Sequence, residues 1–155
     1  MKQIPYGITD FSRIQKENYY YVDKTGLIEK TNAVLNTRQK FICVSRPRRF
    51  GKSMAADMLA AYYDRGENSA SLFSSLKIHY VSSYQQHLNQ YDVIKVNMQE
   101  FLSQSSGIEG MLELLRKSLL WDLLEEYPDF MIYKWIIIDN RSKNRQLLQI
   151  NWLLY

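Results

Sequence analysis

The sequence predicts an α/β fold in which a mostly parallel sheet carries helices on its faces. Two observations lead to this prediction. Short apolar runs typical of buried strands alternate along the chain with segments rich in helix-forming residues. The length of 155 residues, with 46% hydrophobic and 23% charged residues, suits one folded domain. One Cys and two His exclude a disulfide scaffold within the chain and leave little for a metal site.

The first elements are predicted from the N-terminal third of the chain. Residues 19–22 (Tyr-Tyr-Tyr-Val) favour extended structure, and Asp23 is placed to cap a helix over about residues 24–36. Residues 40–45 (Lys-Phe-Ile-Cys-Val-Ser) form a short apolar run that predicts a buried strand, with Cys43 in the core. A helix is expected to begin at Ser53 and to stop at Gly66.

The remaining elements continue this alternation. Residues 93–98 predict a second strand, and residues 106–109 (Ser-Gly-Ile-Glu) predict a capping box that opens a helix, closed by Pro128. The apolar face of that helix is expected to be core and consists of Ile108, Met111, Leu112, Leu115 and Leu119. Residues 133–139 form a third strand candidate, with Asp139 at its carboxyl end.

Charge is distributed unevenly along the chain. Residues 1–52 contain 11 Lys and Arg against 4 Asp and Glu, a net charge of +7. Residues 53–133 have a net charge of −6, and the last 22 residues have +3. The densest cluster consists of Arg46, Arg48, Arg49 and Lys52. Cations packed so closely repel one another unless an anion binds among them.

The segment from residue 45 to residue 53, Ser-Arg-Pro-Arg-Arg-Phe-Gly-Lys-Ser, lies where the predicted strand ends and the predicted helix begins. Gly51 allows backbone N–H groups to turn toward a phosphate, Lys52 can reach phosphate oxygens, and Ser53 can hold Mg²⁺. A strict phosphate-loop motif has Gly where this chain has Arg46, so a basic, solvated turn is the simpler alternative. A nucleic-acid backbone patch fits less well, because the next 80 residues are acidic.

Three blocks of sequence resemble a known family. They are residues 4–11 (Ile-Pro-Tyr-Gly-Ile-Thr-Asp-Phe), residues 20–25 (Tyr-Tyr-Val-Asp-Lys-Thr) followed by Leu27 and Ile28, and residues 45–53. In this order and at these gaps they resemble the predicted AAA-type ATPases of bacteria, whose loop carries arginine in place of the first glycine. The resemblance implies a P-loop NTPase-like, three-layer α/β/α fold. Family members usually carry a PD-(D/E)XK nuclease-like domain at the C-terminus.

The resemblance also implies a site for ATP and Mg²⁺. Lys52 is the implied catalytic residue, and Ser53 and Asp139 are the implied metal ligands. The implied nucleotide contacts are Arg48, Arg49, Phe50, Gly51, Lys52, Ser53 and Met54. Asp23 and Lys24 match a family block of unassigned role, and their simplest interpretation is a helix cap and a surface cation.

The resemblance weakens after about residue 130, so the sequence is divided into an N-terminal ATPase-like part, residues 1–130, and a divergent tail, residues 131–155. In the family a strand ends in two acids, one that holds Mg²⁺ and one that polarises water. Here Asn140 follows Asp139 and cannot act as a base. For residues 131–155 we therefore favour an adventitious strand followed by a basic tail, from a truncated or frame-shifted reading frame, over a true metal-binding strand. The sheet is accordingly expected to be incomplete at its C-terminal end.

Two classes of function stay open from the sequence. The first is the N-terminal part of a P-loop ATPase that binds ATP but hydrolyses it slowly or not at all. The second is a non-catalytic remnant or interaction module that binds a nucleotide, an anion or nucleic-acid phosphate through residues 46–52. Expected partners are ATP, nucleic acid through a further C-terminal domain, and a second copy of the chain through the unpaired edge of the 40–45 strand. No leader and no apolar run of about 18 residues is present, which predicts a cytoplasmic protein without membrane contact.

Overall fold

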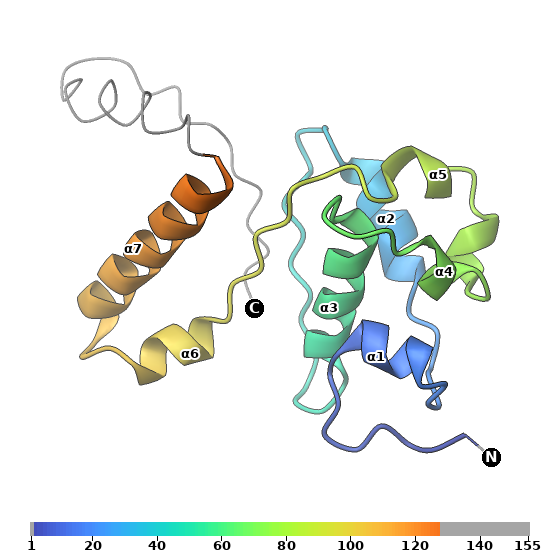
Figure 1. Ribbon diagram of the computed structural model, residues 1–155, viewed down its shortest axis with the longest axis horizontal. Helices are drawn as coiled ribbons and strands as arrows, with labels where there is room; N and C mark the ends of the chain where they lie inside the picture. Colours follow the sequence, from blue (N-terminus) through green and yellow to red (C-terminus); the bar gives the residue numbers. More distant parts are fainter. Residues whose placement is uncertain (1, 128–155) are drawn as a thin grey trace. The chain divides into compact units, whose positions relative to one another are not determined.

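The computed structural model describes residues 2–127, which divide into two compact units, residues 2–96 and 97–127 (Figure 1). The first unit contains helices α1 (Phe11–Lys16), α2 (Gly26–Val34), α3 (Lys52–Tyr63), α4 (Ala70–Phe73) and α5 (Tyr84–His87), and the 3-10 helix η1 (Lys77–Tyr80). The second contains α6 (Met98–Ser103) and α7 (Ile108–Glu126).

The predicted α/β fold with a parallel sheet is wrong for the part of the chain that the structure describes. Residues 2–127 contain helices and no β-strand. The described residues therefore do not form the expected three layers, since the sheet that would be the middle layer is missing from them. Residues 19–22, 40–45 and 93–97 are not strands, and Met98 begins a helix. An isolated parallel bridge joins Asp64 to Tyr91.

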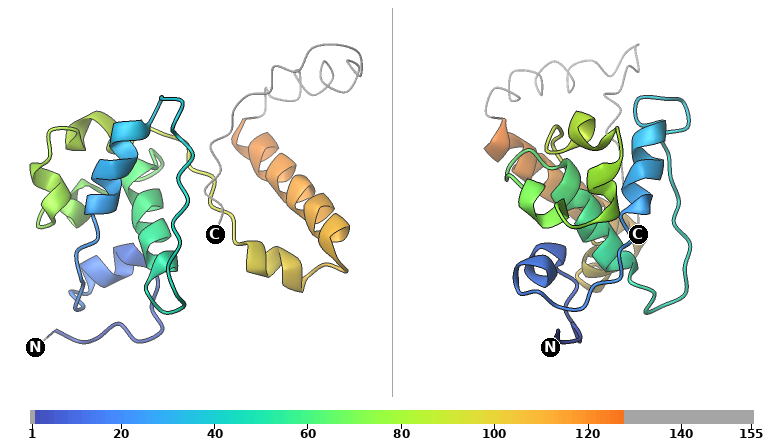
Figure 2. Two further views of the ribbon diagram at one scale, coloured as in Figure 1. Left: turned by 180° about the vertical axis from the view of Figure 1, so that it is seen from behind. Right: turned by 90° about the vertical axis from the view of Figure 1, so that its right-hand side faces the viewer.

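The apolar run at residues 40–45 is mostly exposed and does not form the buried strand that its composition predicts. The side chains of Phe41 and Val44 are 71% and 40% exposed, and Cys43 is exposed, so its predicted place in the core is wrong. Strand propensity mainly expresses how well a side chain fits a half-buried pleated surface. Without such a surface, these residues run as extended chain along the first unit (Figure 2).

An aromatic core formed around α3 holds the first unit together. Met58, Leu59, Tyr62 and Tyr63 recur at helical spacing on one face of α3, and all four are buried. The rings of Tyr62 and Phe73 meet edge to face with centroids 5.5 Å apart. Further core residues come from the other helices of the first unit and from the segments beside them: Phe11, Ile28, Leu72, Phe73, Leu76, Ile78, Tyr84 and Leu88. The predicted helix is thus confirmed, with its start at Lys52 and its end three residues before Gly66.

A buried polar network joins α2 to this core. The side chain of Asn32 donates to the hydroxyl of Tyr62 over 3.2 Å and accepts from the hydroxyl of Tyr63 over 2.7 Å. Tyr62 in turn donates to the backbone carbonyl of Tyr84 over 2.7 Å. Because these polar groups have partners, their burial is tolerated, and they fix α2 alongside α3 (Figure 2).

The second unit is less well packed within residues 97–127. The predicted helix is present as α7, but the predicted capping box is wrong, since Gly107 is the N-cap residue and no side chain caps the helix. Of the apolar face predicted to be core, Met111 is buried, whereas Ile108 and Leu112 are 70% and 53% exposed. Leu115 and Leu119 are partly buried. The expectation that this face is core is therefore confirmed for Met111 and wrong for Ile108 and Leu112, and Pro128 lies outside the described residues.

None of the helices in the described range combines the length and the apolar content that a membrane-spanning helix requires.

Candidate phosphate-binding site

The candidate site is built around the start of α3. Gly51 is the N-cap residue and has φ +74° and ψ +34°, a left-handed conformation that costs glycine little and other residues more. Arg49, two residues earlier, also has a positive φ of +68°. These two positions turn the chain sharply between the extended segment and the helix. We call residues 46–51 the Arg loop.

The N-terminus of α3 is not neutralised by its own sequence. No side chain caps it, and its first turn contains no acidic residue. The first N–H groups of a helix, here those of Lys52, Ser53 and Met54, have no partner within the helix. Together with the helix dipole, they favour an anion at this end.

Lys52, the first residue of α3, bends its side chain back over the Arg loop. Its ammonium donates to the carbonyl of Arg46 over 2.6 Å and to that of Pro47 over 3.2 Å. The ammonium therefore lies against the loop rather than extending into solvent away from it. Both acceptors are neutral carbonyl oxygens, and a charged phosphate oxygen is a stronger acceptor.

A second lysine, Lys24, reaches the same loop from the turn before α2. Its ammonium donates to the carbonyl of Phe50 over 2.8 Å. It also lies so close to Gly51 that a Cβ atom at that position would overlap it. From the sequence, the simplest interpretation of Lys24 is a surface cation, and nothing in a spacing of 26 residues indicates this contact.

The residues on either side of Lys24, Asp23 and Thr25, are both hydrogen-bonded to η1. We call residues 23–25 the anchor turn. The carboxylate of Asp23 accepts from the backbone N–H of Thr25 over 2.8 Å, from its hydroxyl over 2.6 Å, and from the N–H of Lys77 over 2.8 Å. Thr25 is fully buried and its hydroxyl accepts from the N–H of Ile78 over 3.2 Å. The expected helix-cap role of Asp23 is wrong in detail, because α2 begins at Gly26 with Thr25 as N-cap residue.

These contacts change the acidity of the groups beside Lys24. Burial alone would raise the pKa of Asp23, but hydrogen bonds from Thr25 and Lys77 outweigh it and hold that pKa below its ordinary value. Burial raises the pKa of Tyr21 to about 12, although a hydrogen bond from the N–H of Lys24 opposes the rise. Asp23 is thus an anion and Tyr21 a neutral hydroxyl at neutral pH.

Comparison with known proteins shows the family of the chain. A family model described as "Predicted AAA-ATPase" matches residues 5–151. The chain belongs to this predicted AAA-ATPase family. It is also 40% identical over 79 residues to an "Uncharacterized protein in vnfD 5′ region" of Azotobacter chroococcum mcd 1. The matched stretch is 50% of this chain and 14% of that relative. No solved structure matches.

In this AAA-ATPase family member, the structure brings together most of the residues that the sequence singled out. Arg48, Arg49, Phe50 and Ser53 are exposed at the junction of the Arg loop and α3, and Gly51, Lys52 and Met54 are partly buried there. Asp139, the other candidate metal ligand, lies outside the described residues, as does Asn140. Within residues 2–127 no group of three or more His, Cys, Asp or Glu side chains could hold a metal ion.

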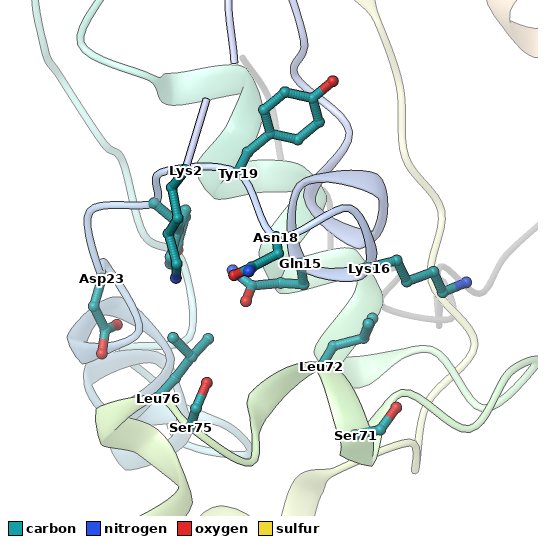
Figure 3. Close-up of a pocket in the computed structure, with 11 residues that line it drawn as sticks. Lys2, Gln15, Lys16, Asn18, Tyr19, Asp23, Ser71, Leu72, Ser75 and Leu76 are labelled. Atoms are coloured by element: carbon teal, nitrogen blue, oxygen red, sulfur yellow. The ribbon is translucent and has the colours of Figure 1, made fainter. Parts of the chain in front are cut away.

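The family member also has a pocket of about 550 Å³ away from the Arg loop (Figure 3). It lies beside α1 and α4, and the amides of Gln15 and Asn18 point toward it. The amide nitrogen of Gln15 is buried and has no hydrogen-bond partner. Asp23 lines this pocket, but no residue of the Arg loop does, so the pocket does not coincide with the candidate phosphate site.

Proposed function

We propose that this chain binds ATP at the N-terminus of α3, with the triphosphate held between the Arg loop and Lys52. The observation that carries the proposal is the conformation of Gly51-Lys52-Ser53: a left-handed glycine, then an uncapped helix start with an ammonium folded over the preceding loop. Membership of the predicted AAA-ATPase family supports the same ligand.

Each part of the junction has a task in this proposal. The free N–H groups at the start of α3 donate to phosphate oxygens, and Lys52 exchanges the carbonyls of Arg46 and Pro47 for charged acceptors. Arg48 and Arg49, both exposed, neutralise the remaining charge. Met54 contributes a backbone N–H group and Phe50 lies at the edge of the bound nucleotide.

Magnesium fits this site as an ion that arrives with the nucleotide. Mg²⁺ usually keeps several waters and binds few protein groups besides the phosphates, so the hydroxyl of Ser53 is a sufficient protein ligand at the junction. The ion supplies charge neutralisation on the phosphate oxygens when bound.

We also propose that hydrolysis by this chain is slow or absent. Phosphoryl transfer to water needs a group that positions the attacking water. A second carboxylate is expected after Asp139, and the chain has Asn140 there. Turnover of ATP by the purified chain at about one per second, the low end of typical enzyme rates, contradicts this part of the proposal.

The test of ATP binding is titration calorimetry with Mg-ATP on the unaltered chain and on Lys52→Ala. Loss of one charge-assisted hydrogen bond of about 1.5–3 kcal/mol lowers the affinity about ten- to a hundredfold. Lys30→Ala is the matched control, because Lys30 is an exposed lysine of α2 and is not part of the Arg loop. Equal affinity of Lys52→Ala and the unaltered chain contradicts the proposal.

A second candidate function is binding of nucleic-acid phosphate through the Arg loop. The observation in its favour is that Arg46, Arg48 and Arg49 are all exposed on one short loop. Single-stranded DNA that displaces Mg-ATP, and that loses affinity steeply as salt rises, supports this alternative.

A further inference from the structure

Two lysines far apart in the sequence reach the same short loop. Lys52 lies on the carbonyls of Arg46 and Pro47, and Lys24 lies on the carbonyl of Phe50, the residue between Arg49 and Gly51. The Lys24 ammonium also contacts the side of Gly51 where a side chain would stand. It therefore lies next to the residue that precedes the first free N–H groups of α3.

The backbone that carries Lys24 is fixed more firmly than the loop it reaches. Its neighbour Asp23 is bound to the N–H of Lys77, and its neighbour Thr25 is buried and bound to the N–H of Ile78. Both anchors belong to η1, more than fifty residues away in the sequence. The side chain of Lys24 is only partly buried, so its four-carbon stem can move on a rigid base.

Within the described residues the Lys24 ammonium donates to one neutral carbonyl, that of Phe50, and such an ammonium can exchange this acceptor for a stronger one. A hydrogen bond between an ammonium and a phosphate oxygen is charge-assisted and about twice as strong as one between neutral groups. The Arg loop also has a high density of positive charge, which Lys24 increases. This arrangement favours a ligand of several negative charges over a singly charged one.

We propose that Lys24 is a phosphate-binding residue of this site, donating to the triphosphate together with Lys52. This inference rests on the proposed function, since it names a further ligand group at the same site. It also accounts for the close approach of Lys24 to Gly51, because the absence of a side chain at residue 51 leaves room for the ammonium beside the start of α3.

The competing explanation is that Lys24 only holds the loop through Phe50. Two substitutions separate the explanations. Lys24→Gln removes the charge and leaves an amide donor on a side chain one bond shorter, whereas Lys24→Arg keeps both a donor and the charge. Lys30→Gln, an exposed lysine on α2, is the matched control for the loss of one positive charge.

The experiment is titration of Mg-ATP into each variant at two salt concentrations, with thermal unfolding of each variant measured in parallel. We expect Lys24→Gln to bind about tenfold more weakly and with less dependence on salt, Lys24→Arg to stay within about threefold of the unaltered chain, and Lys30→Gln to be unchanged. A lower melting temperature in Lys24→Gln alone, with unchanged affinity, overturns the inference.

The outcomes also separate this inference from the proposed function. If the unaltered chain binds Mg-ATP and Lys52→Ala does not, ATP binding stands, and equal affinity of Lys24→Gln and the unaltered chain overturns only the role of Lys24. If the unaltered chain does not bind Mg-ATP, both the proposed function and the role of Lys24 are overturned.

Discussion

The anchor turn and the Arg loop meet at one hydrogen bond, between Lys24 and Phe50, yet they are held in opposite ways. In the anchor turn, Thr25 is fully buried and the Asp23 carboxylate accepts three hydrogen bonds. In the Arg loop, residues 46–50 are exposed and the loop carbonyls accept from lysine side chains. The buried, hydrogen-bonded turn therefore supplies rigidity, and we expect the exposed loop to supply contact with a ligand.

The largest expected effect comes from removing the carboxylate of the anchor turn. Asp23→Ala leaves the N–H and hydroxyl of Thr25 and the N–H of Lys77 without their acceptor. We expect the free energy of unfolding to fall by about 2–3 kcal/mol, measured by urea denaturation. Glu67→Ala, an exposed acid outside the helices, is the control and should change stability by less than about 0.5 kcal/mol. Equal stability of the two variants contradicts the anchoring role of Asp23.

The next effect is expected where the two segments touch. Gly51→Ala places a methyl group against the Lys24 ammonium and forces a left-handed conformation on alanine. We expect a loss of about 1–2 kcal/mol in unfolding free energy, together with weaker Mg-ATP binding. Gly26→Ala is the matched control, since a Cβ atom there meets nothing within 4 Å and its φ is not positive. A Gly51→Ala variant as stable as Gly26→Ala shows that residue 51 is not constrained.

A smaller effect concerns acid pH. The folded state holds the pKa of Asp23 below its ordinary value of 3.8, so its stabilising contribution is present above pH 3.8 and disappears as the pH falls through the folded-state pKa. We expect the unaltered chain to lose stability more steeply than Asp23→Asn as the pH is lowered below about 4. Chemical denaturation across this range measures the difference, and parallel curves would exclude a contribution from Asp23.

The smallest effect on stability is expected in the Arg loop itself. Arg48→Gln alters an exposed side chain, so the free energy of unfolding should stay within about 0.5 kcal/mol of the unaltered chain. Its affinity for Mg-ATP should still fall about two- to threefold, because one charge near the triphosphate is lost. Arg38→Gln, an exposed arginine outside the loop, controls for net charge. A clear fall in the unfolding free energy of Arg48→Gln would contradict the view that the anchor turn, and not the Arg loop, contributes to stability.

The sequence alone determined the local features that depend on neighbouring residues. The start of α3 after Gly51 follows from a glycine that can be left-handed and from the strong helix formers behind it. The helical character of α7 follows from its periodic leucines in the same way. The family was also recognisable, because its blocks are short, ordered motifs that can be compared directly.

Only the tertiary structure decided which of these features meet. Whether residues 40–45 form a strand depends on a neighbouring strand, and the composition of the run cannot supply one. The pairing of Lys24 with Phe50 depends on the anchoring of the turn by η1, more than fifty residues further along the chain. A hydrogen bond between distant residues requires the fold to place both groups within about 3 Å, and no local pattern encodes that distance. Propensity and motif are therefore properties of a segment, whereas burial and the second lysine of the site are properties of the folded chain.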